Sequence, residues 1–145
     1  MTTAKSPPTF SMVRKIRFGH TDPAGIVYYP NYFDMFNGTV EDFFEECVGA
    51  SFQQMLREHG VVTPLRHVDC EFPAPSRIGD RLRLDLTLVA LGRSSITLTI
   101  EGTVEDVLRV RARLVIVFVS TEKGQPVAPP PKVAERLQAL MASTG

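Results

Sequence analysis

The sequence contains only two cysteines and no long apolar run. Cys47 and Cys70 fit no metal-binding spacing and make a poor disulfide framework, a usage typical of a reducing cytosol. The first ten residues, MTTAKSPPTF, hold no apolar stretch of signal-peptide length, and no later run approaches a membrane span. We therefore predict a cytoplasmic protein that has no membrane partner.

Neither sign of charge is in excess. Sixteen Lys and Arg residues balance sixteen Asp and Glu residues, so the formal net charge at pH 7 is zero. Because no net positive field attracts polyanions, nucleic acid is not an expected partner. The three histidines, His20, His59 and His67, fall in different predicted elements, and no acidic cluster completes a coordination shell. We therefore expect no metal site and no bound cofactor.

Common motifs of nucleophilic catalysis and phosphate binding are also absent. Ser94 and Ser95 have no nucleophile-elbow context, and Cys47 falls on the apolar face of a predicted helix, where a buried inert thiol is ordinary. No glycine-rich phosphate loop is present. These absences exclude a recognisable serine triad and favour another chemistry.

The length and composition predict one globular domain over residues 1–145. The chain has 43% hydrophobic and 22% charged residues, enough for one stable core and too few residues for two. Residues 1–11 are predicted to be a loose tail, followed by a strand over residues 12–18. The segment GQPVAPPP breaks the chain before a short amphipathic C-terminal helix over residues 131–141.

The central pattern is a long amphipathic helix. Pro30 suits the first helical position, and Gly49 provides a plausible end. The apolar residues recur at helical spacing: Phe33, Phe36, Val40, Phe43, Phe44 and Cys47. A second short helix is predicted between Ser51, as its cap, and Gly60.

After Thr63 the spacing of the apolar residues changes from the helical period to every second residue. Alternating apolar residues predict antiparallel strands in RLRLDLTLVAL, SSITLTI and VRARLVIVFV, with a hairpin at LGRS. The order of one strand, a long helix and four further strands indicates an α+β fold. Because Val115, Val117 and Val119 make the end of the last strand apolar on both faces, we predict that a partner subunit covers it.

Residues 17–32, RFGHTDPAGIVYYPNY, resemble the signature of the 4-hydroxybenzoyl-CoA thioesterase branch of the hotdog-fold superfamily. The resemblance extends more loosely over residues 12–120. It implies a hotdog fold, in which an antiparallel sheet wraps around one long central helix. It also implies homodimers with a continuous sheet, which often pair into homotetramers.

The same segment has a chemical interpretation. Pro23 disfavours helical geometry at Asp22 and holds the carboxylate on a turn, and the start of the helix near Tyr29 exposes unpaired N–H groups. Such N–H groups stabilise a developing oxyanion. The resemblance assigns Asp22 as the catalytic carboxylate and the backbone N–H of Tyr29 as the oxyanion donor. Whether Asp22 acts as a nucleophile or as a base for water stays open.

The resemblance also implies how the substrate is bound. Basic side chains on the surface are expected to hold the CoA nucleotide, through Arg93 and Ser94 in the hairpin and through Ser120, Thr121 and Lys123 after the last strand. The alternating Arg109, Arg111 and Arg113 form either a phosphate-binding row or a solvated strand face.

Four further residues are candidates for substrate binding: His20, Tyr32, Asn37 and Thr63. The aromatic-CoA prototype carries aspartate at the position of His20, which is therefore either a support for Asp22 or a loop residue. The prototype also carries aspartate at the position of Asn37, where it recognises a ring hydroxyl, whereas an amide hydrogen-bonds without charge. Tyr32, Phe33 and Phe36 either line an acyl pocket or pack in the core.

These residues predict hydrolysis of an acyl-CoA thioester, with an aromatic acyl group, to the carboxylic acid and free CoA. Two alternatives stay open. One is a thioesterase of the same fold that acts on acyl carrier protein, and the other is a non-catalytic module that binds or senses acyl-CoA. The intact motif around Asp22 argues against the non-catalytic alternative.

Overall fold

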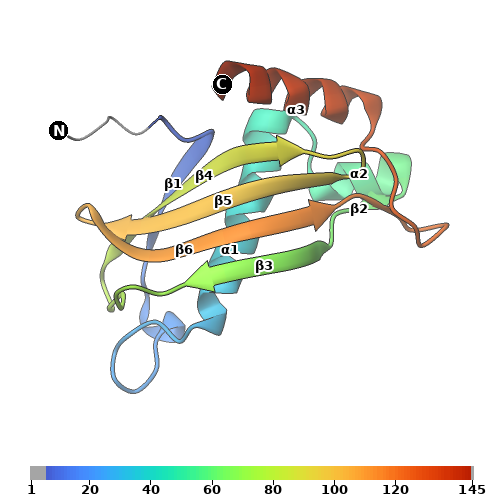
Figure 1. The fold of residues 1–145 in the computed structure, drawn as a ribbon. Helices are drawn as coiled ribbons and strands as arrows, with labels where there is room; N and C mark the ends of the chain where they lie inside the picture. Colours follow the sequence, from blue (N-terminus) through green and yellow to red (C-terminus); the bar gives the residue numbers. More distant parts are fainter. Residues whose placement is uncertain (1–5, 145) are drawn as a thin grey trace.

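A five-stranded antiparallel sheet curls around one long helix in the computed structural model, which describes residues 6–144 (Figure 1). The strand order is β1-β4-β5-β6-β3. The strands are β1 (Phe10–Lys15), β3 (Leu65–Glu71), β4 (Arg81–Leu91), β5 (Ser95–Val104) and β6 (Val107–Val117). Two short strands, β2 (Val61–Val62) and β7 (Val119–Ser120), form a separate antiparallel pair. This arrangement confirms the predicted α+β class.

The inner face of the sheet and the buried face of α1 (Pro30–Phe43) form the core. The alternating leucines of β4 and the alternating residues of β5 and β6 are buried as predicted. On α1 the buried residues are Tyr32, Met35, Phe36, Thr39, Val40 and Phe43, whereas Phe33 is only partly buried. The spacing of apolar residues therefore predicted the helix correctly. The buried face is rotated toward Tyr32, Met35 and Thr39 relative to the predicted one.

The predicted end of the long helix at Gly49 and both predicted limits of the second helix, Ser51 and Gly60, are confirmed. The last turn of the long helix widens into one π turn, η2 (Phe44–Val48), and Gly49 follows it with φ of 82°. Ser51 caps α2 (Phe52–His59) by accepting a hydrogen bond from the Gln54 N–H. Gly60 ends α2 with φ of 63°. A positive φ suits glycine at both positions because it has no Cβ.

The predictions for the chain ends need correction. The first strand was predicted over residues 12–18, but β1 spans Phe10–Lys15, and the chain then forms the short 3-10 helix η1 (Phe18–His20). Phe10 belongs to the sheet because it pairs with Leu86, so the predicted tail 1–11 is too long. Its residues 1–5 lie outside the described part.

The C-terminal helix α3 (Pro131–Thr144) is longer than the predicted range 131–141. β1 pairs with β4 only as far as Leu86, and α3 packs against β4, where Val133 and Leu137 are buried. The guanidinium Nε of Arg136 donates to the carbonyl of Cys47 at 2.8 Å. α3 therefore shields sheet surface that the short β1 leaves open.

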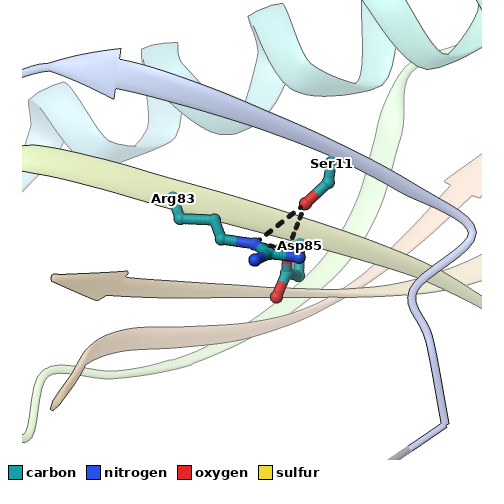
Figure 2. A network of polar contacts seen from close by, with 3 residues as sticks. All are labelled: Ser11, Arg83 and Asp85. Carbon is teal, nitrogen blue, oxygen red and sulfur yellow. Dashed lines mark hydrogen bonds and ion pairs between the residues drawn. The ribbon is translucent and has the colours of Figure 1, made fainter. Parts of the chain in front are cut away.

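The outer face of the sheet is polar around β1 and β4. Arg83 Nε donates to Asp85 Oδ1 at 2.9 Å and to Ser11 Oγ at 3.3 Å, and the Ser11 hydroxyl donates to the same Asp85 oxygen. Figure 2 shows these three side chains gathered on the two neighbouring strands. Toward the end of β6 the outer face is more apolar. Val117 is already buried within one chain, while Val115 and Val119 are partly buried.

Candidate active site

Asp22 lies in a tight loop that is closed by backbone hydrogen bonds between its own residues. Its N–H donates to the Ile26 carbonyl at 2.9 Å, and its own carbonyl accepts the Gly25 N–H at 2.9 Å. Its carboxylate Oδ1 accepts the Ala24 N–H at 2.9 Å. This Asx-type contact orients the carboxylate, and no described residue donates to Oδ2. The turn predicted from the Asp-Pro dipeptide therefore leaves one carboxylate oxygen available.

The start of α1 leaves one backbone donor free. Pro30 has no N–H, the Asn31 N–H donates to the Tyr28 carbonyl at 2.9 Å, and the Tyr32 N–H donates to the Tyr29 carbonyl at 3.1 Å. Among the described residues the N–H of Tyr29 has no acceptor. This donor lies at the positive end of the α1 dipole, where a developing negative charge is favoured.

His20 connects the Asp22 loop to the helix through its backbone. Its carbonyl accepts the Tyr28 N–H at 3.0 Å and the side-chain amide of Asn31 at 2.7 Å. Its ring Nδ1 accepts the Arg17 N–H at 2.9 Å, and no hydrogen bond joins the ring to Asp22 among the described residues. The contact with Asn31 was missed by sequence reasoning, although the Tyr-Pro-Asn-Tyr motif contains that residue.

Asn37 and Thr63 line one small cavity of about 80 Å³. The other lining residues are apolar and come from α1, α2, β3 and β6: Phe33, Phe36, Val40, Phe52, Leu65, Leu114 and Ile116. The structure thus brings together two predicted substrate-binding residues from different elements. An apolar cavity with a few polar groups is a common form of a ligand site.

Tyr32 does not line this cavity. Its side chain is 3% exposed, and its hydroxyl donates to Ser76 Oγ at 2.8 Å. Burial raises the pKa of Tyr32, while the hydrogen bonds of Ser76 and the positive charge of Arg109 oppose that rise. The ring packs against Phe72, which also contacts the exposed ring of Tyr29. Within one chain, Tyr32 therefore fixes the first turn of α1 against Ser76 and Phe72.

The predicted nucleotide-binding residues gather at one end of the sheet. The exposed Arg93 and the partly buried Ser94 form the β4–β5 hairpin, and the Ser94 carbonyl accepts the Phe118 N–H at 2.8 Å. The Thr121 hydroxyl donates to the Gly60 carbonyl at 3.0 Å, and Ser120 Oγ accepts the Lys123 N–H at 3.1 Å. The side chain of Lys123 is exposed as well, so Arg93 and Lys123 both present a cationic group to solvent at this end.

The Asp22 loop lies at the opposite end of the sheet (Figure 1). Ile26 forms a bridge with Arg77, just before β4 begins at Arg81, whereas Arg93 follows the end of β4 at Leu91. β4 has 11 residues, and at the usual rise per residue such a strand extends about 35 Å. Within one chain, the carboxylate and the nucleotide-binding candidates are therefore far apart.

The two cysteines, Cys47 and Cys70, are both free thiols. Burial raises the pKa of the Cys47 thiol, and it raises the pKa of Cys70 to about 11. Both thiols are therefore poor nucleophiles near neutral pH. Within residues 6–144 no group of three His, Cys, Asp or Glu side chains is placed to hold a metal ion. No helix in the same range is long and apolar enough to cross a membrane.

Comparison with known proteins identifies the family. Residues 16–137 match the family model of the thioesterase-like superfamily. The chain belongs to this superfamily. A solved structure with the same fold is 4-hydroxybenzoyl-CoA thioesterase from Pseudomonas sp. strain CBS-3, with a TM-score of 0.78 and 27% identity over 87% of this chain and 96% of that one. The predicted hotdog fold and family resemblance are confirmed.

Two curated relatives are identical to this chain at about one third of the aligned positions. A 1,4-dihydroxy-2-naphthoyl-CoA hydrolase from Synechococcus elongatus is 32% identical over 85 residues, 58% of this chain and 62% of the relative. The Pseudomonas 4-hydroxybenzoyl-CoA thioesterase is 30% identical over 88 residues, 60% of this chain and 62% of the relative. The matched part thus spans about three fifths of these relatives' length.

Proposed function

We propose that this protein hydrolyses the CoA thioester of an aromatic carboxylic acid to the free acid and CoA. The observation that carries the proposal is that Asp22, with one free carboxylate oxygen, lies on the loop that leads into the start of α1, where the N–H of Tyr29 has no acceptor among the described residues. A negative group and an oxyanion donor are the two parts that acyl transfer needs.

The N–H of Tyr29 donates to the thioester carbonyl oxygen and stabilises the charge that forms there. In one route an Asp22 oxygen bonds to the carbonyl carbon, the C–S bond breaks, and CoA leaves as a thiolate. Water then cleaves the mixed anhydride and restores the carboxylate. In the other route Asp22 takes a proton from water as the water oxygen attacks the same carbon, and that proton passes to the departing sulfur.

The substrate class rests on the cavity beside Asn37 and on the names of the relatives. The cavity is lined by Phe33, Phe36 and Phe52, which suit a flat ring, and the amide of Asn37 offers a donor and an acceptor to a ring substituent. The named relatives act on dihydroxynaphthoyl and hydroxybenzoyl thioesters. These features favour an aromatic acyl group over a long aliphatic one.

The function also requires more than one copy of the chain. The arm that joins a CoA thioester to its phosphates has far fewer chain atoms than the backbone of β4, so one substrate does not reach both Asp22 and Arg93 of one chain. Exposed apolar rings surround the Asp22 loop, with Phe18 72%, Tyr29 59% and Phe72 45% exposed. We propose a homodimer or homotetramer in the cytoplasm, in which this surface is covered and each site uses two copies.

Two alternatives predict other outcomes in one assay. Thiol release is measured from a panel of benzoyl-, hydroxybenzoyl-, naphthoyl- and long-chain acyl-CoAs, with the matching acyl carrier protein thioesters in parallel. The proposal expects turnover with aromatic CoA thioesters. Preference for the carrier-protein thioesters identifies the first alternative, and tight CoA-thioester binding without turnover identifies the non-catalytic module.

A further inference from the structure

Ser76 links the two halves of the proposed site. Its backbone carbonyl accepts the Val27 N–H at 2.9 Å, on the arm that follows the Asp22 turn. Its side-chain Oγ accepts the Tyr32 hydroxyl at 2.8 Å, from the first turn of α1. Ser76 is fully buried. A shift of Ser76 therefore moves the loop that bears Asp22 relative to the helix start that bears the Tyr29 N–H.

Ser76 belongs to an irregular segment between β3 and β4 that needs an external support. Arg109 supplies one from β6, because its Nη1 donates to the Pro75 carbonyl at 2.5 Å and lies 3.8 Å from Asp80 Oδ2. These two contacts lie on either side of Ser76 in the sequence. The Asp80 carboxylate also accepts the Arg77 N–H at 2.8 Å, which closes the segment into one unit.

Arg109 differs from the other arginines of its strand because of a register shift. The β5–β6 pairing shifts between Gly102 and Thr103, where Gly102 pairs with Val110 and Thr103 with Leu108. This leaves Arg109 in a bulge, with 18% of its side chain exposed, whereas Arg111 is 50% exposed and pairs with Glu101 at 2.8 Å. A bulge commonly redirects a side chain beside a functional site.

The buried position of the Arg109 guanidinium also lowers the stability of the fold. Its Nε is buried and has no hydrogen-bond acceptor among residues 6–144. An unpaired buried N–H is unfavourable, so packing of the sheet alone does not account for an arginine here. Arg109 also lies close enough to Tyr32 for its charge to act on that phenol.

We propose that Arg109 is a positioning residue, which fixes the segment around Ser76 and thereby sets the Asp22 carboxylate against the Tyr29 N–H. The part that concerns catalysis rests on the proposed thioester hydrolysis. The part that concerns geometry does not. Among residues 6–144, Arg109 makes no hydrogen bond or ion pair with Asp22 or Tyr29, and its action passes through Pro75, Ser76 and Val27.

The first test compares Arg109→Met, Arg109→Lys and the matched control Arg83→Met. Arg83 lies on β4 with 57% of its side chain exposed, and like Arg109 it contacts one carboxylate, that of Asp85. With an aromatic acyl-CoA that the wild type hydrolyses, we expect kcat of Arg109→Met to fall about ten- to a hundredfold with little change in KM, as misplacement of reacting groups does. Arg109→Lys should recover part of that loss, and Arg83→Met should match the wild type.

The second test needs no activity. Hydrogen exchange of the peptide that contains Val27 and Tyr29 is measured by mass spectrometry, and tyrosinate formation is followed by ultraviolet absorbance. Arg109→Met should speed exchange of this peptide severalfold and raise the pH at which Tyr32 ionises, because the opposing positive charge is gone. Ser76→Ala should speed the same exchange while Arg109 stays in place.

The outcomes distinguish a failure of the proposed thioester hydrolysis from a failure of the positioning role of Arg109. If wild type hydrolyses no thioester but exchange responds to Arg109→Met, the proposed function fails and the positioning role stands. If Arg109→Met folds with unchanged exchange and unchanged kcat, the positioning role is overturned. If it merely lowers the melting temperature and leaves both readouts unchanged well below that temperature, Arg109 is structural and the proposal is again overturned.

Discussion

The side-chain amide of Asn31 donates to the backbone carbonyl of His20 at 2.7 Å, and this contact joins the first turn of α1 to the residue two positions before Asp22. The same carbonyl accepts the Tyr28 N–H. The two ends of the loop are thus joined by the contacts of His20 with Tyr28 and by the pairing of Thr21 with Val27.

Asn31→Ala should lower kcat by about tenfold and destabilise the fold by about 1 kcal/mol, since a part-buried hydrogen bond is lost and the loop is less fixed. His20→Ala should do less, because it keeps the carbonyl that Asn31 contacts. Steady-state kinetics and urea unfolding measure both effects. A larger loss of kcat in His20→Ala than in Asn31→Ala would indicate a direct role for the imidazole.

Asp22→Asn should lower kcat by roughly a hundredfold or more, because it keeps the shape of the side chain and removes the charge that the chemistry requires. The affinity for a non-hydrolysable acyl-CoA analogue should survive, as calorimetry can check. A folded Asp22→Asn protein that hydrolyses within a fewfold of wild type contradicts the mechanism and leaves the Tyr29 N–H as the main catalytic group.

Asn37 should set the choice of acyl group. Asn37→Asp should shift the ratio of kcat/KM toward acyl groups with a hydroxyl donor, and Asn37→Leu should shift it toward unsubstituted rings. Thr63→Val is a companion variant, because Thr63 lines the same cavity with a different polar group. Identical selectivity in wild type and both Asn37 variants would remove this cavity from substrate recognition.

Arg93→Ala should raise KM and leave kcat nearly unchanged, because an arginine–phosphate contact on an exposed hairpin binds ground state and transition state alike. Added salt should raise the wild-type KM, since charges are screened over roughly 8 to 10 Å at ordinary ionic strength. A fall in kcat alone would contradict the nucleotide-binding role.

Mixing subunits should reveal whether one site uses two chains. When Asp22→Asn and Arg93→Ala proteins are unfolded and refolded together, roughly a quarter of the sites in a statistical mixture of dimers should regain both intact residues. Activity at low substrate concentration should then exceed that of either protein alone. Refolding Arg93→Ala with the Asp22→Asn, Arg93→Ala double variant is the control, and equal activity in both mixtures would place each site within one chain.

Cys70 should make stability fall at alkaline pH. Burial raises its pKa in the folded state from 9.0 to about 11, so between these values the unfolded chain loses the thiol proton more readily than the folded chain. The free energy of unfolding should therefore decrease as pH rises from 9 toward 11. Cys70→Ala should flatten this slope in urea titrations at several pH values, and an unchanged slope would assign the effect to other groups.

The sequence by itself determined the elements whose causes are local. Pro30 and Gly49 set the limits of the long helix, Ser51 and Gly60 set those of α2, and alternating leucines identified β4, because each signal depends on backbone chemistry within a few residues. The Asp22 turn is equally local. Its family resemblance then led from a turn to a candidate carboxylate and a free N–H.

Only the tertiary structure decided which distant groups meet. The hydroxyl of Tyr32 reaches Ser76 across 44 positions of sequence, and Asn37 shares a cavity with Thr63. Arg109 departs from its alternating neighbours because a one-residue shift in strand register redirects its side chain. Register and loop packing depend on the sum of many weak contacts across the sheet, so no short sequence pattern encodes them.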